Sequence, residues 1–91
     1  MILTGYRSVV HVRQIDRFPT FNGVGKDPYE VDVNLATIES IDPCKVTEFL
    51  GPGKGHRDVE LENFFTLFLT SGKEIHIDET TRDELRARMN P

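Results

Sequence analysis

Hydrophobic and polar positions follow their clearest pattern in the last third of the chain, between Phe64 and Met89. The run FFTLFLT at residues 64–70 is apolar on both faces of an extended strand, whereas KEIHID at residues 73–78 alternates between charged and apolar side chains. Serine and glycine at 71–72 separate the runs, so the pattern predicts two strands joined by a tight turn. A strand that is apolar on both faces needs cover on both sides.

The turn leaves two registers open for this hairpin. A two-residue turn pairs Phe68 with Ile75, whereas a glycine bulge at Gly72 pairs Leu67 with Ile75. We favour the bulge, because the other register brings polar side chains onto the leucine face. The opposite face then carries a mixed set of residues: Phe64, Thr66, Phe68, Glu74 and His76.

Phe64 and Phe68 on this second face need cover that the hairpin itself does not supply. The alternatives are the segment 16–28 with its two phenylalanines, the C-terminal helix, or a second copy of the chain. Two uncovered phenylalanines would form an interaction patch. Intramolecular cover and dimerisation stay open as equal alternatives, and Phe64, Phe68 and His76 are candidate interaction residues.

A short helix is predicted over ETTRDELRARM at residues 79–89. Thr80 or Thr81 is expected as its N-cap, and Glu84 would complete a capping box that starts at Thr81. Leu85 and Met89 lie four residues apart and form the expected buried stripe. A helix of about ten residues is marginal alone, so it must dock on the sheet.

Shorter extended runs precede the hairpin. Strands are predicted at residues 7–15, 29–33, 37–41 and 45–50. The spacing of Leu35, Ile38 and Ile41 would also suit one helical turn, and Asp42-Pro43 is expected to end this element. Glycine and proline predict long loops at 16–28 and 51–63.

These elements together predict an α+β fold that is mainly β. We expect a small antiparallel sheet or partly open barrel of about five to six strands, with one short C-terminal helix. A chain of 91 residues supports one hydrophobic core, so residues 1–91 are expected to form a single domain.

Charge is unevenly distributed, with a formal net value of −4 at pH 7. The N-terminal region carries Arg7 and Arg13 on its predicted strand and is basic, whereas the rest of the chain is acidic. The glycine-rich segment GPGKGHR at residues 51–57 adds three basic or titratable side chains: Lys54, His56 and Arg57. These residues would suit an acidic partner such as nucleic acid, but the overall acidity disfavours one, because basic side chains drive phosphate binding.

Catalytic and metal-binding patterns are absent from the sequence. The three histidines lack the spacing of zinc ligands. Cys44, the single cysteine, follows a proline in an expected turn, with no neighbour marked to stabilise a thiolate. The 51–57 segment lacks the Ser or Thr and the following helix of a phosphate-binding loop. We therefore expect no enzymatic activity, no cofactor and no metal.

Neither a signal peptide nor a membrane span is indicated by the sequence. The N-terminus is charged by its seventh residue, and no run approaches 18 consecutive apolar residues. With a single cysteine, the chain fits a reducing compartment. We expect a cytoplasmic protein without a membrane partner.

The stretches YEVDVNLATIESID and FFTLFLTSGKEIHIDETTRDELRARM, within residues 29–50 and 64–89, resemble the small flagellar FlbD-type proteins. The resemblance implies a regulatory or accessory role without catalytic residues. The same elements resemble the LytTR-type DNA-binding domains, although the acidity disfavours that function. We expect a non-enzymatic interaction or regulatory module with a protein partner, self-associating as a homodimer. The alternative is a nucleic-acid-binding module that uses the basic edge and residues 51–57.

Overall fold

The structure is a computed structural model that describes residues 1–11, 22–49 and 52–90. Its elements, in chain order, are β1 (Ile2–His11), β2 (Asn22–Asp32), the 3-10 turn η1 (Leu35–Thr37), β3 (Ile38–Phe49), β4 (His56–Leu69), β5 (Glu74–Asp78) and α1 (Glu79–Met89). The predicted fold class is confirmed, because five strands form one antiparallel sheet and a single helix follows at the C-terminal end.

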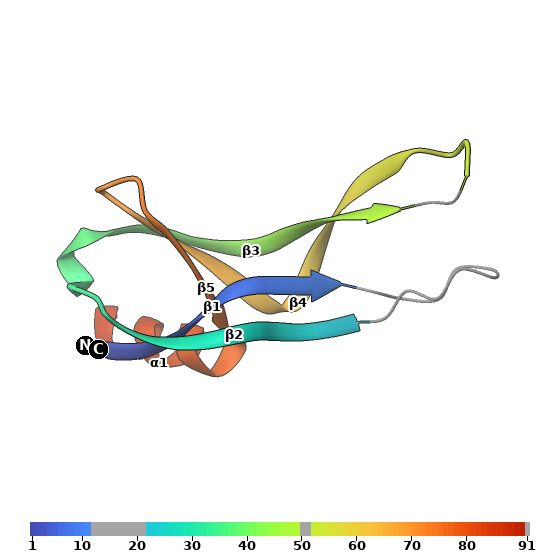
Figure 1. Cartoon of the computed structure of the whole chain (residues 1–91). Helices are drawn as coiled ribbons and strands as arrows, with labels where there is room; N and C mark the ends of the chain where they lie inside the picture. Colours follow the sequence, from blue (N-terminus) through green and yellow to red (C-terminus); the bar gives the residue numbers. More distant parts are fainter. Residues whose placement is uncertain (12–21, 50–51, 91) are drawn as a thin grey trace.

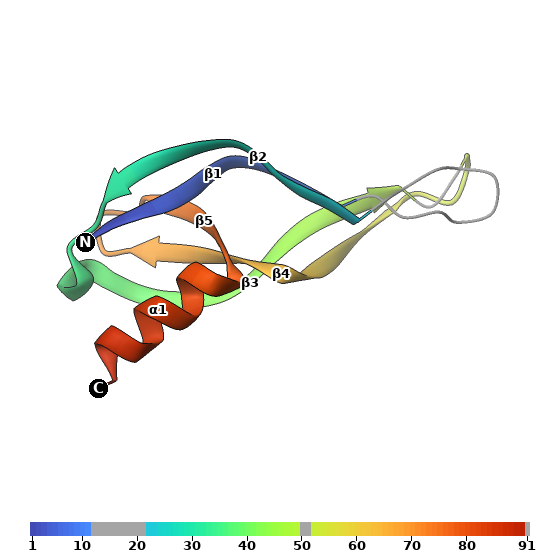
Figure 2. The same ribbon diagram turned by 90° about the horizontal axis from the view of Figure 1, so that it is seen from below.

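The strands lie in the order β2-β1-β5-β4-β3, and every neighbouring pair is antiparallel. β5 is the central strand and has only 5 residues, whereas β1 has 10 and β4 has 14. The outer pairs therefore run on beyond β5 as two arms, the first made of β1 and β2 and the second of β3 and β4. Both arms extend toward the same end of the molecule (Figures 1 and 2).

One face of the sheet packs against α1 and forms the main core (Figure 2). Its buried residues are Leu3, Val33, Phe65, Leu67, Ile75, Ile77 and Leu85. Leu85 is fully buried as predicted, but Met89 is 39% exposed, so the expected helical stripe is wrong at its second position. The guanidinium of Arg82 lies 4.2 Å from the ring centroid of Phe65 and covers the edge of this core.

The other face of the sheet holds a second, smaller core. Cys44, Leu61 and Phe64 are its buried members, and Tyr6, Val9 and Val46 pack against them. These residues come from β1, β3 and β4. β1 and β3 make contact although β5 and β4 separate them in the strand order, so the sheet is open but strongly curled.

The β4–β5 hairpin has the predicted bulged register. Leu67 pairs with Ile75 and Phe65 with Ile77. Gly72 has a φ of 88°, and its N–H donates to the carbonyl oxygen of Leu69 at 2.9 Å. This backbone conformation favours glycine, which explains why the turn sequence determines the pairing.

The predicted N-cap of the helix is wrong. Asp78 is the N-cap, and its Oδ1 accepts a hydrogen bond of 2.8 Å from the N–H of Thr81. β5 ends at Asp78 and α1 begins at the next residue, so the strand leads into the helix without a linker. Aspartate is among the strongest N-cap residues, and Thr81 is buried in the first turn instead.

Several strands are longer than predicted, and the loops are correspondingly shorter. β2 begins at Asn22 and β4 at His56, so the predicted 16–28 and 51–63 loops extend too far. β3 continues through Asp42-Pro43, which was expected to end it. β3 is an edge strand, where a proline is tolerated, and the pairing register shifts directly after Pro43. Residues 12–21, including Arg13, Phe18 and Phe21, lie outside the described residues.

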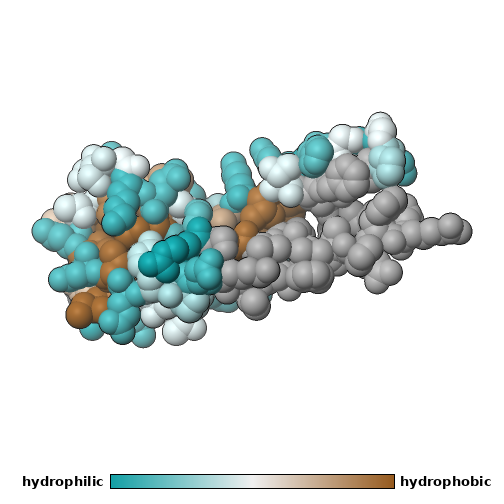
Figure 3. Space-filling model, in the orientation of Figure 1, coloured by the Kyte–Doolittle hydropathy of each residue, from teal (hydrophilic) through white to brown (hydrophobic). Residues whose placement is uncertain are grey.

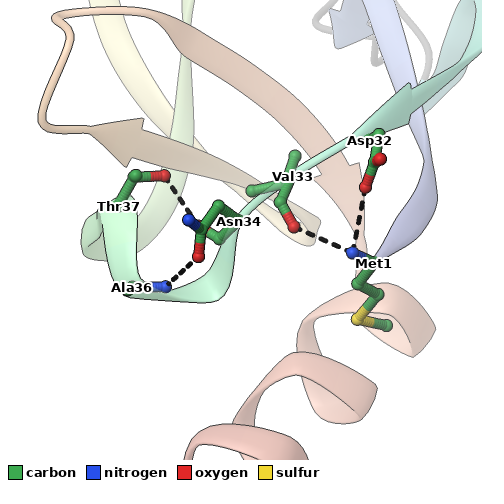
Figure 4. Close-up of polar contacts among 6 residues, drawn as sticks. All are labelled: Met1, Asp32, Val33, Asn34, Ala36 and Thr37. Carbon is green, nitrogen blue, oxygen red and sulfur yellow. Dashed lines mark hydrogen bonds and ion pairs between the residues drawn. The ribbon is translucent and has the colours of Figure 1, made fainter.

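The connection from β2 to β3 combines both alternatives that the sequence left open, because η1 leads directly into a strand. The side chain of Asn34 caps η1 by accepting a hydrogen bond of 3.0 Å from the N–H of Ala36 (Figure 4). Beside this turn, the amino group of Met1 lies 3.0 Å from a carboxylate oxygen of Asp32 and 3.0 Å from the carbonyl oxygen of Val33. These contacts fasten the beginning of β1 to the end of β2.

Candidate functional site

The candidate site lies on the sheet face opposite α1, where β4 and β5 present alternate residues. Phe64 pairs with Asp78, Thr66 with His76, and Phe68 with Glu74. The bulged register therefore brings together the residues that the sequence placed on this face. Their surroundings differ along the strand, because only one end of the face is covered.

Phe64 is covered within the chain and is only 8% exposed. Its ring meets the ring of Tyr6 edge to face, with centroids 5.6 Å apart and an interplanar angle of 89°. Cys44 and Leu61 complete its surroundings. Phe64 is therefore a core residue and is not available as a contact surface. The curling of β1 and β3 over this face supplies its cover, which was not among the predicted alternatives.

Phe68, in contrast, is half-buried and lines an open groove of ≈ 420 Å³. We call this the Phe68 groove, and its lining residues are Asp42, Pro43, Lys45, Glu60, Thr66, Phe68, Glu74 and His76. The volume is in the range of binding pockets, which run to about 300–1,000 Å³. Phe68 is not among the residues packed into either core cluster.

The Phe68 groove is acidic. Three carboxylates line it, from Asp42, Glu60 and Glu74, against the single ammonium of Lys45, which gives −2 with a neutral His76. All four of these charged residues are exposed. The groove thus combines an aromatic side chain with a polar, negatively charged rim. Of these residues, Asp42, Lys45 and Glu60 were not predicted as site residues, because they are brought to the groove by the long-range pairing of β3 with β4.

His76 connects the groove with the second core. Its Nδ1 lies 3.1 Å from the hydroxyl oxygen of Thr66 and 3.7 Å from the sulfur of Cys44. Cys44 is only 2% exposed. Burial raises the pKa of the Cys44 thiol, and the hydrogen bond with Thr66 offsets only part of that rise. The thiol stays protonated at neutral pH, so this cysteine and histidine do not provide an activated nucleophile.

Asp78 makes a further polar contact at the covered end of this face. The hydroxyl of Tyr6 donates a hydrogen bond of 3.2 Å to Oδ2 of Asp78, while Oδ1 caps α1. Burial, and then the neighbouring Asp78 carboxylate, raise the pKa of Tyr6. Tyr6 therefore keeps its proton at neutral pH, and one carboxylate joins β1, β5 and α1.

The predicted basic residues are not gathered into one surface. Arg7 lies on β1 in the first arm, with its guanidinium 4.7 Å from the ring centroid of Tyr29. Lys54, His56 and Arg57 are exposed, and they lie in the turn between β3 and β4 or at the start of β4. This turn forms the end of the second arm (Figure 1). Arg13 lies outside the described residues.

Few apolar side chains reach the surface. Ile2 and Met89 are the exposed large hydrophobic residues in the described parts of the chain. In the left part of Figure 3, hydrophobic residues are visible between hydrophilic ones.

Within the described ranges, no helix has the length and apolar character needed to cross a membrane. In the same ranges, no group of three or more His, Cys, Asp and Glu side chains is arranged to hold a metal ion. No family model, curated protein or solved structure matches the chain. The resemblances to FlbD-type and LytTR-type proteins therefore stay predictions.

Proposed function

We propose that the chain is a non-enzymatic module that acts through protein–protein association and that it associates with copies of itself. The observation that carries this proposal is Phe68, a half-buried aromatic residue in an open, polar-rimmed groove on the face that α1 leaves free. Aromatic side chains in partly enclosed sites, ringed by polar residues, are typical of the residues that dominate binding energy at interfaces.

The state of the thiol and of the carboxylates favours association over catalysis. The single thiol, of Cys44, is buried and protonated. Nδ1 of His76 lies close both to this thiol and to the hydroxyl of Thr66. The carboxylates of the Phe68 groove are exposed, whereas a carboxylate acting in acid–base catalysis needs a buried site that raises its pKa. A protein–protein contact can use exposed carboxylates without a raised pKa.

Sedimentation velocity of the wild type and Phe68→Ser, over a wide range of concentration, tests the proposal. We expect concentration-dependent association of the wild type and association weaker by roughly tenfold in Phe68→Ser, as for a residue that dominates an interface. Met89→Ser, which removes an exposed apolar side chain from the other side of the sheet, is the matched control and should associate like the wild type. A wild type that stays monomeric over the whole range of concentration would contradict the proposal.

Nucleic-acid binding is the second candidate, and the exposed tip of the second arm favours it. Residues 52–57 contain Lys54 and Arg57 and no acidic side chain. Binding through such a tip would weaken steeply with salt, because the basic side chains release counterions from phosphates. Retention of the wild type on DNA or RNA columns at low salt, and its loss in Lys54→Glu, would support this function. No retention at low salt would remove it.

A further inference from the structure

A cation covers a phenylalanine on the α1 side of the sheet. The guanidinium of Arg82 lies 4.2 Å from the ring centroid of Phe65. One of its nitrogens also lies 2.9 Å from a carboxylate oxygen of Asp83 and 3.5 Å from one of Glu79. The face of an aromatic ring attracts a cation, and charged hydrogen bonds to carboxylates hold that cation in position. The chain thus fills one combination of aromatic ring and carboxylates with its own arginine.

The Phe68 groove holds the same kinds of group on the other face of the sheet. Phe68 follows Phe65 by three residues on β4 and lines the groove together with carboxylates from β3, β4 and β5. Glu60 and Glu74 are exposed, and neither makes a hydrogen bond or an ion pair with another residue of the described ranges. Asp42 accepts one hydrogen bond of 3.2 Å from a neighbouring serine hydroxyl.

Within the part of the chain that the structure describes, no cation lies over the ring of Phe68. Lys45 lines the groove, but its ammonium makes no ion pair with any described residue. The arginines of α1 lie on the opposite side of the sheet (Figure 2). The groove therefore keeps an accessible aromatic ring and a charge of −2 with a neutral His76.

Arginine suits such a groove better than lysine does. Its guanidinium is planar and weakly hydrated, so it stacks on an aromatic ring and still donates to carboxylates. The charge of the protein indicates which molecule carries this arginine. A second copy has a net charge of −4 and is repelled by an acidic groove at long range, whereas a basic protein is attracted.

We propose that the Phe68 groove binds an arginine side chain of a different, basic protein, with the guanidinium over the ring of Phe68 and against the carboxylates of Glu60 and Glu74. This inference rests on the proposed role of the groove as a protein contact surface and names the group that the groove recognises. Self-association uses the same groove, so the two contacts exclude each other.

The probe is a blocked peptide with a single arginine between glycines, and amide NMR spectra of the full isotope-labelled chain measure its binding. The protein is kept dilute so that monomers predominate. We expect the amide signals of the groove, among them those of Thr66, Phe68 and Glu74, to shift as peptide is added. The same peptide with citrulline, which keeps the shape of arginine without its charge, should cause no such shifts.

Two variants locate the site in the groove. Phe68→Leu keeps an apolar side chain but removes the ring, and it should weaken peptide binding by roughly threefold or more. Glu60→Gln combined with Glu74→Gln removes two charges and should weaken binding by roughly fivefold to tenfold. The matched control combines Glu30→Gln with Glu84→Gln, the same change in net charge at exposed positions of β2 and α1, and should bind like the wild type. The dispersion of the amide signals shows that each variant is folded.

The outcomes separate the arginine site from self-association. A wild type that self-associates but shows no shifts with the arginine peptide retains the proposed function and overturns the arginine site. Equal shifts with the citrulline peptide, or equal binding by the groove variants and the wild type, overturn it as well. Shifts of the groove signals in a wild type that stays monomeric support the arginine site and contradict self-association. Loss of self-association in Arg86→Gln or Arg88→Gln would show that a second copy carries the arginine, which overturns its assignment to a different protein.

Discussion

At the scale of single residues, the two phenylalanines on the second face have different roles although they lie on the same side of β4. Phe64 packs under Tyr6 and is 8% exposed, whereas Phe68 opens into the groove. The difference arises outside the hairpin, from the curling of β1 and β3 over one end of the face. Phe64 therefore contributes to the second core, whereas Phe68 is accessible for the association proposed above.

The stability of the two phenylalanine variants should differ accordingly. We expect Phe64→Ala to lower the free energy of unfolding by about 3–4 kcal/mol, because it leaves a cavity in the second core. Phe68→Ala should lower it by about 1 kcal/mol, since a half-exposed ring gains less from folding. Urea unfolding measured on monomeric protein tests this difference. Equal losses in both variants would contradict the separate roles.

Gly5 is a second position where a single substitution would disturb the packing. A Cβ at this residue would lie 2.9 Å from Cγ2 of Ile75 and 3.0 Å from the ring of Tyr29. Ile75 is 1% exposed and belongs to the main core, so it has little room to move. We expect Gly5→Ala to reduce the free energy of unfolding by about 1–3 kcal/mol. Thermal unfolding that leaves this variant as stable as the wild type would show that β1 can shift.

Cys44 and Tyr6 make the stability of the fold sensitive to alkaline pH. The pKa of each is raised in the folded state, mainly by burial. A raised pKa means that the folded state prefers the protonated form, so this stability is complete below the ordinary pKa of the unfolded group. For the thiol it is lost as pH rises above about 8.5 and through the raised folded value. We expect Cys44→Ala to flatten the decline of unfolding free energy between neutral and alkaline pH.

At the scale of elements, Asp78 joins three of them with one carboxylate. Oδ1 accepts from the N–H of Thr81 in α1, and Oδ2 accepts from the hydroxyl of Tyr6 on β1. We expect Asp78→Ala to cost about 1–2 kcal/mol, since it removes an N-cap and leaves the hydroxyl without this acceptor. Tyr6→Phe should cost about 1 kcal/mol and leave the cap intact. A double-mutant cycle with additive losses would contradict the coupling of β1 to the helix start.

At the scale of the whole molecule, the sequence predicted the features that residues close together in the chain determine, namely the hairpin register and the helix. The glycine of the β4–β5 turn predicted the correct register, and the helix was predicted over the correct residues but with the wrong N-cap. Non-local pairing was not predictable from the same signals. Asp42, Lys45 and Glu60 reach the Phe68 groove only because β3 pairs with β4 over a long stretch. The cover of Phe64 likewise depends on strands distant in sequence.

Salt dependence is a property of the whole molecule that bears on the proposed self-association. Each copy has a formal net charge of −4, and the Phe68 groove itself carries three exposed carboxylates against one lysine. Screening shortens from about 10 Å at 0.1 M salt to about 3 Å at 1 M, so two acidic copies repel each other less at high salt. We therefore expect self-association through Phe68 to tighten as salt rises, measured by sedimentation at both concentrations. Weaker association at 1 M would indicate that attraction between opposite charges, and not the aromatic contact, holds the copies together.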